Sequence, residues 1–240
     1  ILIFIILLGV FVRFHNLGDQ DFMGDEFQVV STAATYHFTE EFYKWDWIQN
    51  ESGKNTDCME LDKFCHYTRA WPHTWMVAKS FDSFGISEWS ARFPSVIFGV
   101  LLIPLTYFFT RYFLENNKIA LISSFAVSLM PFFIGLSRWT RMYVLLIPLF
   151  LITIFLFYKG IKGKTFNKKP ADKLKRFIYK NLNFDYLFLG LGVFSLYWTY
   201  KIHVNSLVLL PVLLIFLIYK SLKTKQIRLF FSSHDEEISL

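Results

Sequence analysis

Hydrophobic residues in this chain occur in long uninterrupted runs, and charged residues are concentrated between the runs. A helix needs about 20 apolar residues to cross the hydrocarbon core of a bilayer. Five runs come close to that length, and a shorter one opens the chain. We interpret the opening run as the end of a truncated helix. The pattern predicts an all-α polytopic membrane helix bundle with spans at about residues 1–12, 93–113, 119–136, 142–158, 184–200 and 204–219.

The distribution of charge predicts which side of the membrane each connection occupies. Residues 159–183 contain nine Lys or Arg and one acidic residue, and four more basic residues follow the last span. Cytoplasmic connections are enriched in Lys and Arg, so both basic segments are expected inside. The segment 13–92 then lies outside, and its 7 basic and 13 acidic residues give it a local charge of −6. The overall charge of +6 is therefore a sign of membrane topology, and no nucleic-acid partner is expected.

The outer segment 13–92 is too long to be a simple connection and shows helical signals. Asp25, with Gln28 three residues later, is expected to cap a first helix. A second helix is predicted from about Pro72 to Gly85, with an aromatic side suited to a membrane interface. A third begins near Ser87 and continues into the second span. The interval between the first two is polar and acidic, and an irregular excursion is expected there.

Two cysteines and two histidines in this segment leave more than one interpretation open. Cys58 and Cys65 lie seven positions apart in an exported loop, where they either form a disulfide or remain free thiols. His66 and His73 are candidates for contacts with an acceptor or for metal binding with Asp25, although solvated histidines are the simpler interpretation.

Seven charged residues are expected at the outer membrane boundary, where an ionised side chain is costly unless it faces a partner or water. Arginine guanidinium groups match phosphate oxygens, and a carboxylate can accept a proton from a hydroxyl group. The combination suggests a reaction with a phosphate leaving group. Taken singly, each arginine is also explained as a snorkelling anchor and Asp25 as a helix cap. These residues are Arg13, Asp25, Glu26, Arg69, Arg92, Arg138 and Arg141.

At these residues the chain resembles the GT-C fold glycosyltransferases that use polyprenyl-phosphate sugars, in particular the protein O-mannosyltransferase and aminoarabinose-transferase branch. The likeness covers about residues 1–160 and implies that the chain corresponds to the N-terminal half of such an enzyme. It is carried by residues 13–18 (RFHNLG) with 24–26 (GDE), 71–75 (WPHTW), 84–95 (FGISEWSARFPS) and 137–143 (SRWTRMY).

The resemblance implies roles for individual positions. Asp25 matches the catalytic acidic residue of the family. Glu26 matches its neighbour, which is structural or lines the pocket, and we group it with Asp25 as a catalytic candidate. Arg92 matches an arginine associated with the donor phosphate. Arg13, Arg69, Arg138 and Arg141 are further candidates for phosphate binding. The stretch 70–72 (AWP) departs from the family pattern of a basic residue and two prolines, so Arg69 or His73 would have to supply that contact.

The expected activity is an inverting transfer of a sugar from a polyprenyl-phosphate donor to an acceptor hydroxyl or phosphate. The acceptor would be a protein, lipid or glycan at the extracytoplasmic or lumenal face of the plasma membrane or the ER membrane. The resemblance leaves a divalent metal open and implies no other cofactor. The alternative function is a transporter or lipid flippase, because prolines inside the spans permit broken helices around a charged outer pocket.

Overall fold

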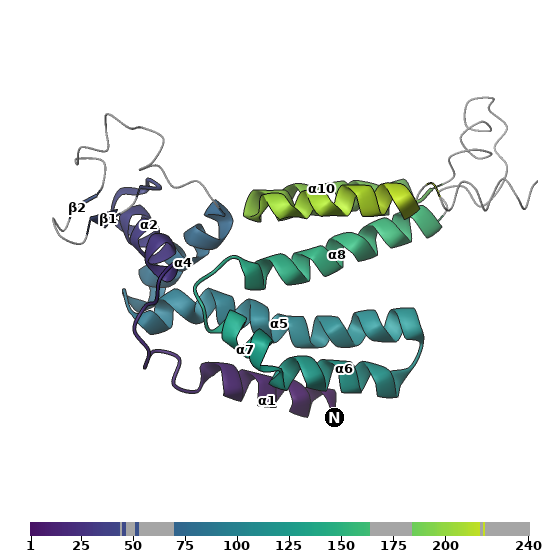
Figure 1. Ribbon diagram of the computed structural model, residues 1–240, viewed down its shortest axis with the longest axis horizontal. Coiled ribbons are helices and arrows are strands. Elements are labelled where there is room, and N and C mark those ends of the chain that lie inside the picture. The colour runs from purple at the N-terminus through teal and green to yellow at the C-terminus, as the bar shows by residue number, and fades with distance from the viewer. Residues whose placement is uncertain (44, 47–50, 53–69, 164–183, 217, 219–240) are drawn as a thin grey trace, which may run out of the picture. The chain divides into compact units, whose positions relative to one another are not determined.

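In the computed structural model, the chain is described at residues 1–43, 45–46, 51–52, 70–163, 184–216 and 218 (Figure 1). Regular structure in this part of the chain is almost entirely helical. Its two strands, β1 (Trp45–Asp46) and β2 (Glu51–Ser52), are two residues long and pair antiparallel. The predicted candidates Arg69 and His66, and both cysteines, lie outside the described residues.

The chain divides into two compact units. The first contains Ile1–Ile152 and Tyr197–His203, and the second contains Thr153–Leu196 and Val204–Leu240. All the described candidate site residues belong to the first unit. Within the second unit, the Oγ1 atom of Thr153 and the Oγ atom of Ser195 lie 2.7 Å apart in a hydrogen bond between two apolar helices.

The apolar helices of the chain support the predicted membrane architecture. α5 (Glu88–Leu114) and α8 (Tyr143–Lys162) are each long and apolar enough to cross a membrane. α6 (Asn117–Leu129) and α7 (Pro131–Ser137) meet the same criterion as a pair, but they are bent by 58° relative to each other. The prediction of an all-α membrane helix bundle is thus confirmed, whereas the expected continuous span at 119–136 is broken near its middle.

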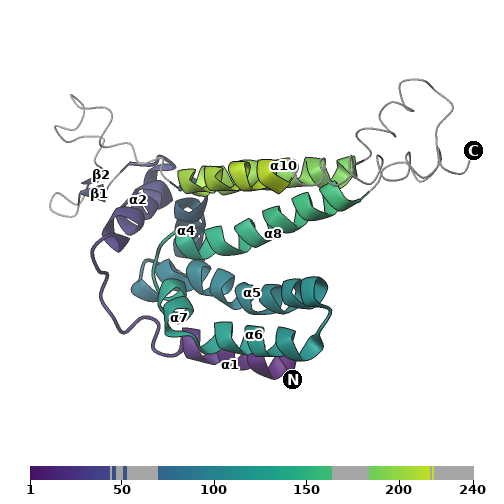
Figure 2. The same cartoon turned by 45° about the vertical axis from the view of Figure 1, so that its right-hand side comes forward.

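The remaining apolar helices are shorter. α1 (Leu2–Phe14) ends just beyond the predicted first span, α10 (Tyr186–Ile202) matches the fifth, and the 3-10 turn η3 (Val204–Val208) opens an apolar helix that runs to Phe216. In the first unit, α1, α5 and α6 lie side by side, as Figures 1 and 2 both show.

In the described part of segment 13–92, two helices pack on the start of α5. α2 (Glu26–Thr39) and α4 (Trp71–Phe84) begin and end close to the predicted positions, and α5 begins with the predicted Ser87 as its N-cap. A buried apolar cluster joins the three helices through Val30 of α2, Phe81 of α4 and neighbouring side chains. This cluster fixes the position of the α2 N-terminus relative to α5.

A proline explains how α4 is attached to α5. Pro94 lies inside α5 and has no N–H group, so the carbonyl of Ser90 four residues earlier loses its helical donor. The Oγ hydroxyl of Ser80 in α4 donates to this carbonyl at 2.6 Å. The Ser90 carbonyl that the proline leaves without a helical donor therefore binds α4 to α5.

Candidate functional site

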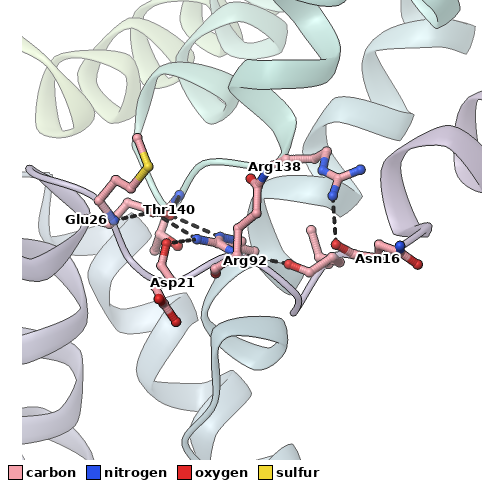
Figure 3. A network of polar contacts seen from close by, with 9 residues as sticks. Asn16, Asp21, Glu26, Arg92, Arg138 and Thr140 are labelled. Carbon is pink, nitrogen blue, oxygen red and sulfur yellow. Dashed lines mark hydrogen bonds and ion pairs between the residues drawn. The ribbon is translucent and has the colours of Figure 1, made fainter.

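A buried ion pair links α2 to α5 in the first unit (Figure 3). Nε of Arg92 donates to Oε1 of Glu26 at 3.2 Å, and Nη2 donates to Oε2 at 3.0 Å. The backbone N–H groups of Thr140 and Met23 donate to the same two oxygens, at 2.8 and 3.1 Å. Each carboxylate oxygen of Glu26 thus accepts two hydrogen bonds, and three separate segments meet at one side chain.

Arg92 uses all five of its N–H groups within the protein. Besides its two bonds to Glu26, it donates to the carbonyls of Leu17 (3.0 Å), Gln20 (2.7 Å) and Asp21 (3.1 Å). Since a guanidinium group has five donors, none is left for a substrate phosphate in this arrangement. The geometry instead makes Arg92 a clamp that holds the loop between α1 and α2 against α5.

The environment keeps Glu26 ionised. Burial alone raises the pKa of this carboxyl group, but the hydrogen bonds from Arg92, Thr140 and Met23 outweigh the effect of burial and lower the pKa below its ordinary value of 4.5. The pair is therefore charged at neutral pH and shielded from water, which suits a structural role.

The neighbouring carboxylate, Asp25, has the opposite surroundings. Its side chain is 58% exposed and forms an ion pair with Nη2 of Arg141, whose side chain is only 9% exposed. Asp25 occupies the N-cap position of α2, but its side chain makes no cap hydrogen bond, so the prediction that it caps the helix is wrong. Gly24 precedes it with a φ of 52°, a left-handed conformation that glycine adopts easily.

Arg141 has a further donor available. Its buried Nε has no hydrogen-bond partner among the described residues. An unpaired buried donor is costly, so this atom is suited to an acceptor supplied from outside the chain. These two arginines thus differ, because all five N–H groups of Arg92 have acceptors within the protein, whereas Nε of Arg141 has none among the described residues.

Two other arginines hold the turn that carries Arg141. Arg13, at the end of α1, is fully buried and donates to the carbonyls of Ser128 (2.8 Å) and Val127 (3.0 Å) at the end of α6. Pro131 has no N–H group to donate to the Val127 carbonyl, so Arg13 supplies this hydrogen bond at the break between α6 and α7. Its Nε also donates to Oγ of Ser137 at 3.2 Å.

Arg138 makes the reciprocal connection (Figure 3). Its Nη1 and Nη2 atoms donate to the carbonyls of His15 (2.9 Å) and Asn16 (2.7 Å), which follow α1. Arg13 at the end of α1 and Arg138 at the end of α7 therefore hold these two regions together. The helix break that a transporter could use for an ion site is occupied here by the protein's own Arg13.

His73 lies away from solvent at the start of α4. Its Nε2 is 3.0 Å from Oγ of Ser95, and its Nδ1 has no partner among the described residues. Burial lowers the pKa of His73 to about 4, so the ring is neutral at physiological pH. The expectation of a solvated histidine is wrong at this position. In the described part of the chain, no three His, Cys, Asp or Glu side chains are placed to hold a metal ion, so no ligand set is assigned.

Several contacts of the site were not found from the sequence. Those made by backbone groups, at Leu17, Gln20, Met23 and Thr140, leave no trace in residue type. The role of the Ser137 hydroxyl as a partner of Arg13 was not predicted, although Ser137 lies next to Arg138 in the stretch 137–143 (SRWTRMY). The two serines that pair with Arg13 and His73, Ser137 and Ser95, both lie in stretches singled out for the family resemblance.

The fold and the site together define an integral membrane protein of helical type, with clustered arginines and carboxylates at the start of α2. The family to which the chain belongs follows from comparison with known proteins. The family model described as dolichyl-phosphate-mannose-protein mannosyltransferase matches residues 69–232, more than half of the chain. The chain belongs to this family. Searches of curated proteins and of solved structures gave no match.

Membership identifies the protein as a membrane glycosyltransferase that uses a polyprenyl-phosphate-linked sugar, which confirms the family inferred from the sequence. The matched residues include Arg92, Arg138 and Arg141. Asp25 and Glu26 precede the matched range, so their roles depend on the geometry described above.

Proposed function

We propose that the protein transfers a sugar, with inversion, at the outer or lumenal face of the membrane, with Asp25 as the general base. The observation that carries this proposal is the contrast between two adjacent carboxylates. Glu26 is buried and accepts four hydrogen bonds, whereas Asp25 is exposed and paired only through Arg141 among the described contacts. A base must reach its substrate, and Asp25 is the carboxylate that can do so.

In the proposed reaction, an acceptor hydroxyl oxygen attacks the anomeric carbon on the side opposite the phosphate. The bond between that carbon and the phosphate oxygen breaks, and its electron pair stays on the departing polyprenyl phosphate. The hydroxyl proton passes to Asp25. Arg141 is assigned to the leaving phosphate, because its Nη2 faces Asp25 while its Nε has no partner among the described residues. It would thus stabilise the negative charge that develops on the departing phosphate.

The other arginines receive different roles in this proposal. Arg138 has donors beyond its two carbonyl bonds and is exposed enough to assist in phosphate binding. Arg92 and Arg13 position the loop and the 138–141 turn, since their donors are directed at protein carbonyls, Glu26 and Ser137. Arg69, His66 and His73 remain candidates from the sequence alone.

The outer location is supported by the charge distribution along the chain. The nine basic residues within 159–183 favour the cytoplasmic side for that connection, and alternation of the spans then places Asp25 on the opposite side. The protein would accept its lipid-linked donor from the bilayer and its acceptor from the outer compartment.

The test is transfer from labelled polyprenyl-phosphate mannose to an impermeant hydroxyl acceptor, in vesicles of known orientation. Asp25→Asn is expected to lower the rate by about 10²–10⁴-fold, the usual contribution of a general base. Asp82→Asn is the matched control, because Asp82 is also a partly exposed, paired carboxylate of the outer segment, with Lys79 and His37 as its partners. Full activity of Asp25→Asn, or transfer only from the cytoplasmic side, would contradict the proposal.

A further inference from the structure

Four aromatic side chains cluster where α1 ends, α4 ends and α5 begins. We call this cluster, formed by Phe14, Phe84, Trp89 and Phe93, the aromatic corner. Phe84 lies with its ring centre 5.3 Å from that of Trp89 and 5.1 Å from that of Phe93, and these two are 5.1 Å apart. Phe14 completes the cluster at 6.4 Å from Trp89 and 6.1 Å from Phe93.

The aromatic corner is packed internally but also presents an apolar outer surface. Phe84 is 54% exposed, and Ile86, two residues further on, is 43% exposed. Exposed apolar side chains of this size are unfavourable in water when they are grouped. Their neighbours on the inner side of α5, Ala91 and Arg92, are buried.

The length of α5 indicates which medium surrounds this surface. The helix has 27 residues and is therefore about 40 Å long, whereas the hydrocarbon core is about 30 Å thick and accommodates about 20 residues. Arg111 is the charged residue near the other end of α5 and marks one boundary of the core. Counting about 20 residues back from it places the second boundary near residue 91, between Trp89 and Phe93.

We propose that the aromatic corner is an anchor for the membrane interface, inserted at the level of the lipid headgroups, and that it seats the C-terminal end of α4 on the bilayer. Trp is enriched at this depth because its amphipathic ring suits the boundary between lipid and water, and Trp89 supplies such a ring, while the phenylalanines add apolar surface on the lipid side. The partner is thus the bilayer itself, in continuity with the membrane-spanning part of α5.

The anchor also sets the depth of the site. Arg92 lies between Trp89 and Phe93 in the sequence but turns inward to Glu26. The buried ion pair is consequently fixed to the turn of α5 that carries the aromatic corner. The inference concerns the location of the loop and does not require that Asp25 be the base.

Spin-label accessibility in phospholipid nanodiscs tests this location directly. Single cysteines are placed at Gln28, Ile86 and Leu101, in a protein in which Cys58 and Cys65 are replaced by serine. Gln28 is an exposed position on α2 and serves as the aqueous control, and Leu101 in α5 serves as the control for the bilayer interior. The label at Ile86 is expected about 5–10 Å into the headgroup and acyl boundary, with oxygen favoured over a water-soluble nickel reagent.

A matched pair of substitutions shows whether the aromatic ring is responsible. Phe84→Glu is expected to move the label at Ile86 to the nickel accessibility of the Gln28 position, and Ser83→Glu is expected to leave it unchanged. If the label at Ile86 is as accessible to nickel as the label at Gln28 without either substitution, the anchor does not exist. This measurement on the otherwise unchanged sequence decides the question even where Phe84→Glu impairs folding, and it is independent of transferase activity.

Discussion

Replacing Glu26 by glutamine preserves the shape of the side chain but removes the charge opposite Arg92. Each carboxylate oxygen accepts two N–H groups, whereas the amide nitrogen of glutamine accepts none. Two donors are therefore left without an acceptor, and the Arg92 cation stays buried with only neutral carbonyl partners. Breaking a buried ion pair by removing one member costs about 3–5 kcal/mol. For a chain of 150–250 residues, a loss of this size lowers the melting temperature by roughly 6–20 °C.

The assay is thermal unfolding of the detergent-solubilised protein, measured together with sugar transfer at a temperature where both variants are folded. Asp25→Asn is the matched control, because it removes the adjacent charge from an exposed position. The partner Arg141 is buried, but Asp25 itself is 58% exposed, so the melting temperature of Asp25→Asn should fall by less than that of Glu26→Gln. Glu26→Gln is expected to be the less stable variant but to retain transfer in the folded fraction, while Asp25→Asn is expected to be more stable than Glu26→Gln and inactive.

The reasoning would be refuted if Glu26→Gln melted no earlier than Asp25→Asn. It would also fail if Glu26→Gln melted normally but lost transfer, because the buried carboxylate would then take part in the reaction itself.

Two further predictions concern His73 and the packing of α5 on α7. In the folded protein the pKa of His73 is about 4, whereas in the unfolded chain it is near 6.5. The free energy of unfolding should therefore fall by up to about 3 kcal/mol as the pH drops from 6.5 to 4. Melting curves of His73→Gln should lack this part of the pH dependence, and an unchanged profile would exclude His73 as its source. Gly99→Ala would place a methyl group against Oγ of Ser137, the partner of Arg13, and should cost about 1–3 kcal/mol. In contrast, Gly135→Ala has open space and should be tolerated in the same melting assay.

The parts of the fold that were predicted from the sequence are those that depend on local signals. Ser87 caps α5 by accepting from the N–H group of Ser90, and Pro72 lies in the first turn of α4, as their residue types indicate. The apolar runs likewise predicted helices in the membrane. The bend of 58° between α6 and α7 was not predicted, because a proline within an apolar run is compatible with a straight, a kinked or a broken helix.

The site was predicted as a set of residues but not as a set of pairs. Periodicity cannot tell which of several arginines faces which carboxylate, since the partners are 66 residues apart for Glu26 and Arg92 and more than 100 residues apart for Asp25 and Arg141. Nor could it distinguish the two adjacent acids. Consecutive helical residues point in directions about 100° apart, so one can face the interior while the next faces outward.

The same arrangement determines the charge that a substrate would meet. The candidate site residues that the structure describes are four arginines and two carboxylates, so their formal net charge is 4 − 2 = +2. The charge is positive because, among the described residues, Arg13 and Arg138 donate to carbonyl and hydroxyl oxygens and not to acids. The sequence of segment 13–92, in contrast, carries a formal charge of −6. The positive site attracts an anion only at short range, since screening limits such fields to about 8–10 Å. This favours a phosphate that is brought close to the site on its lipid over an anion that approaches from a distance through solution.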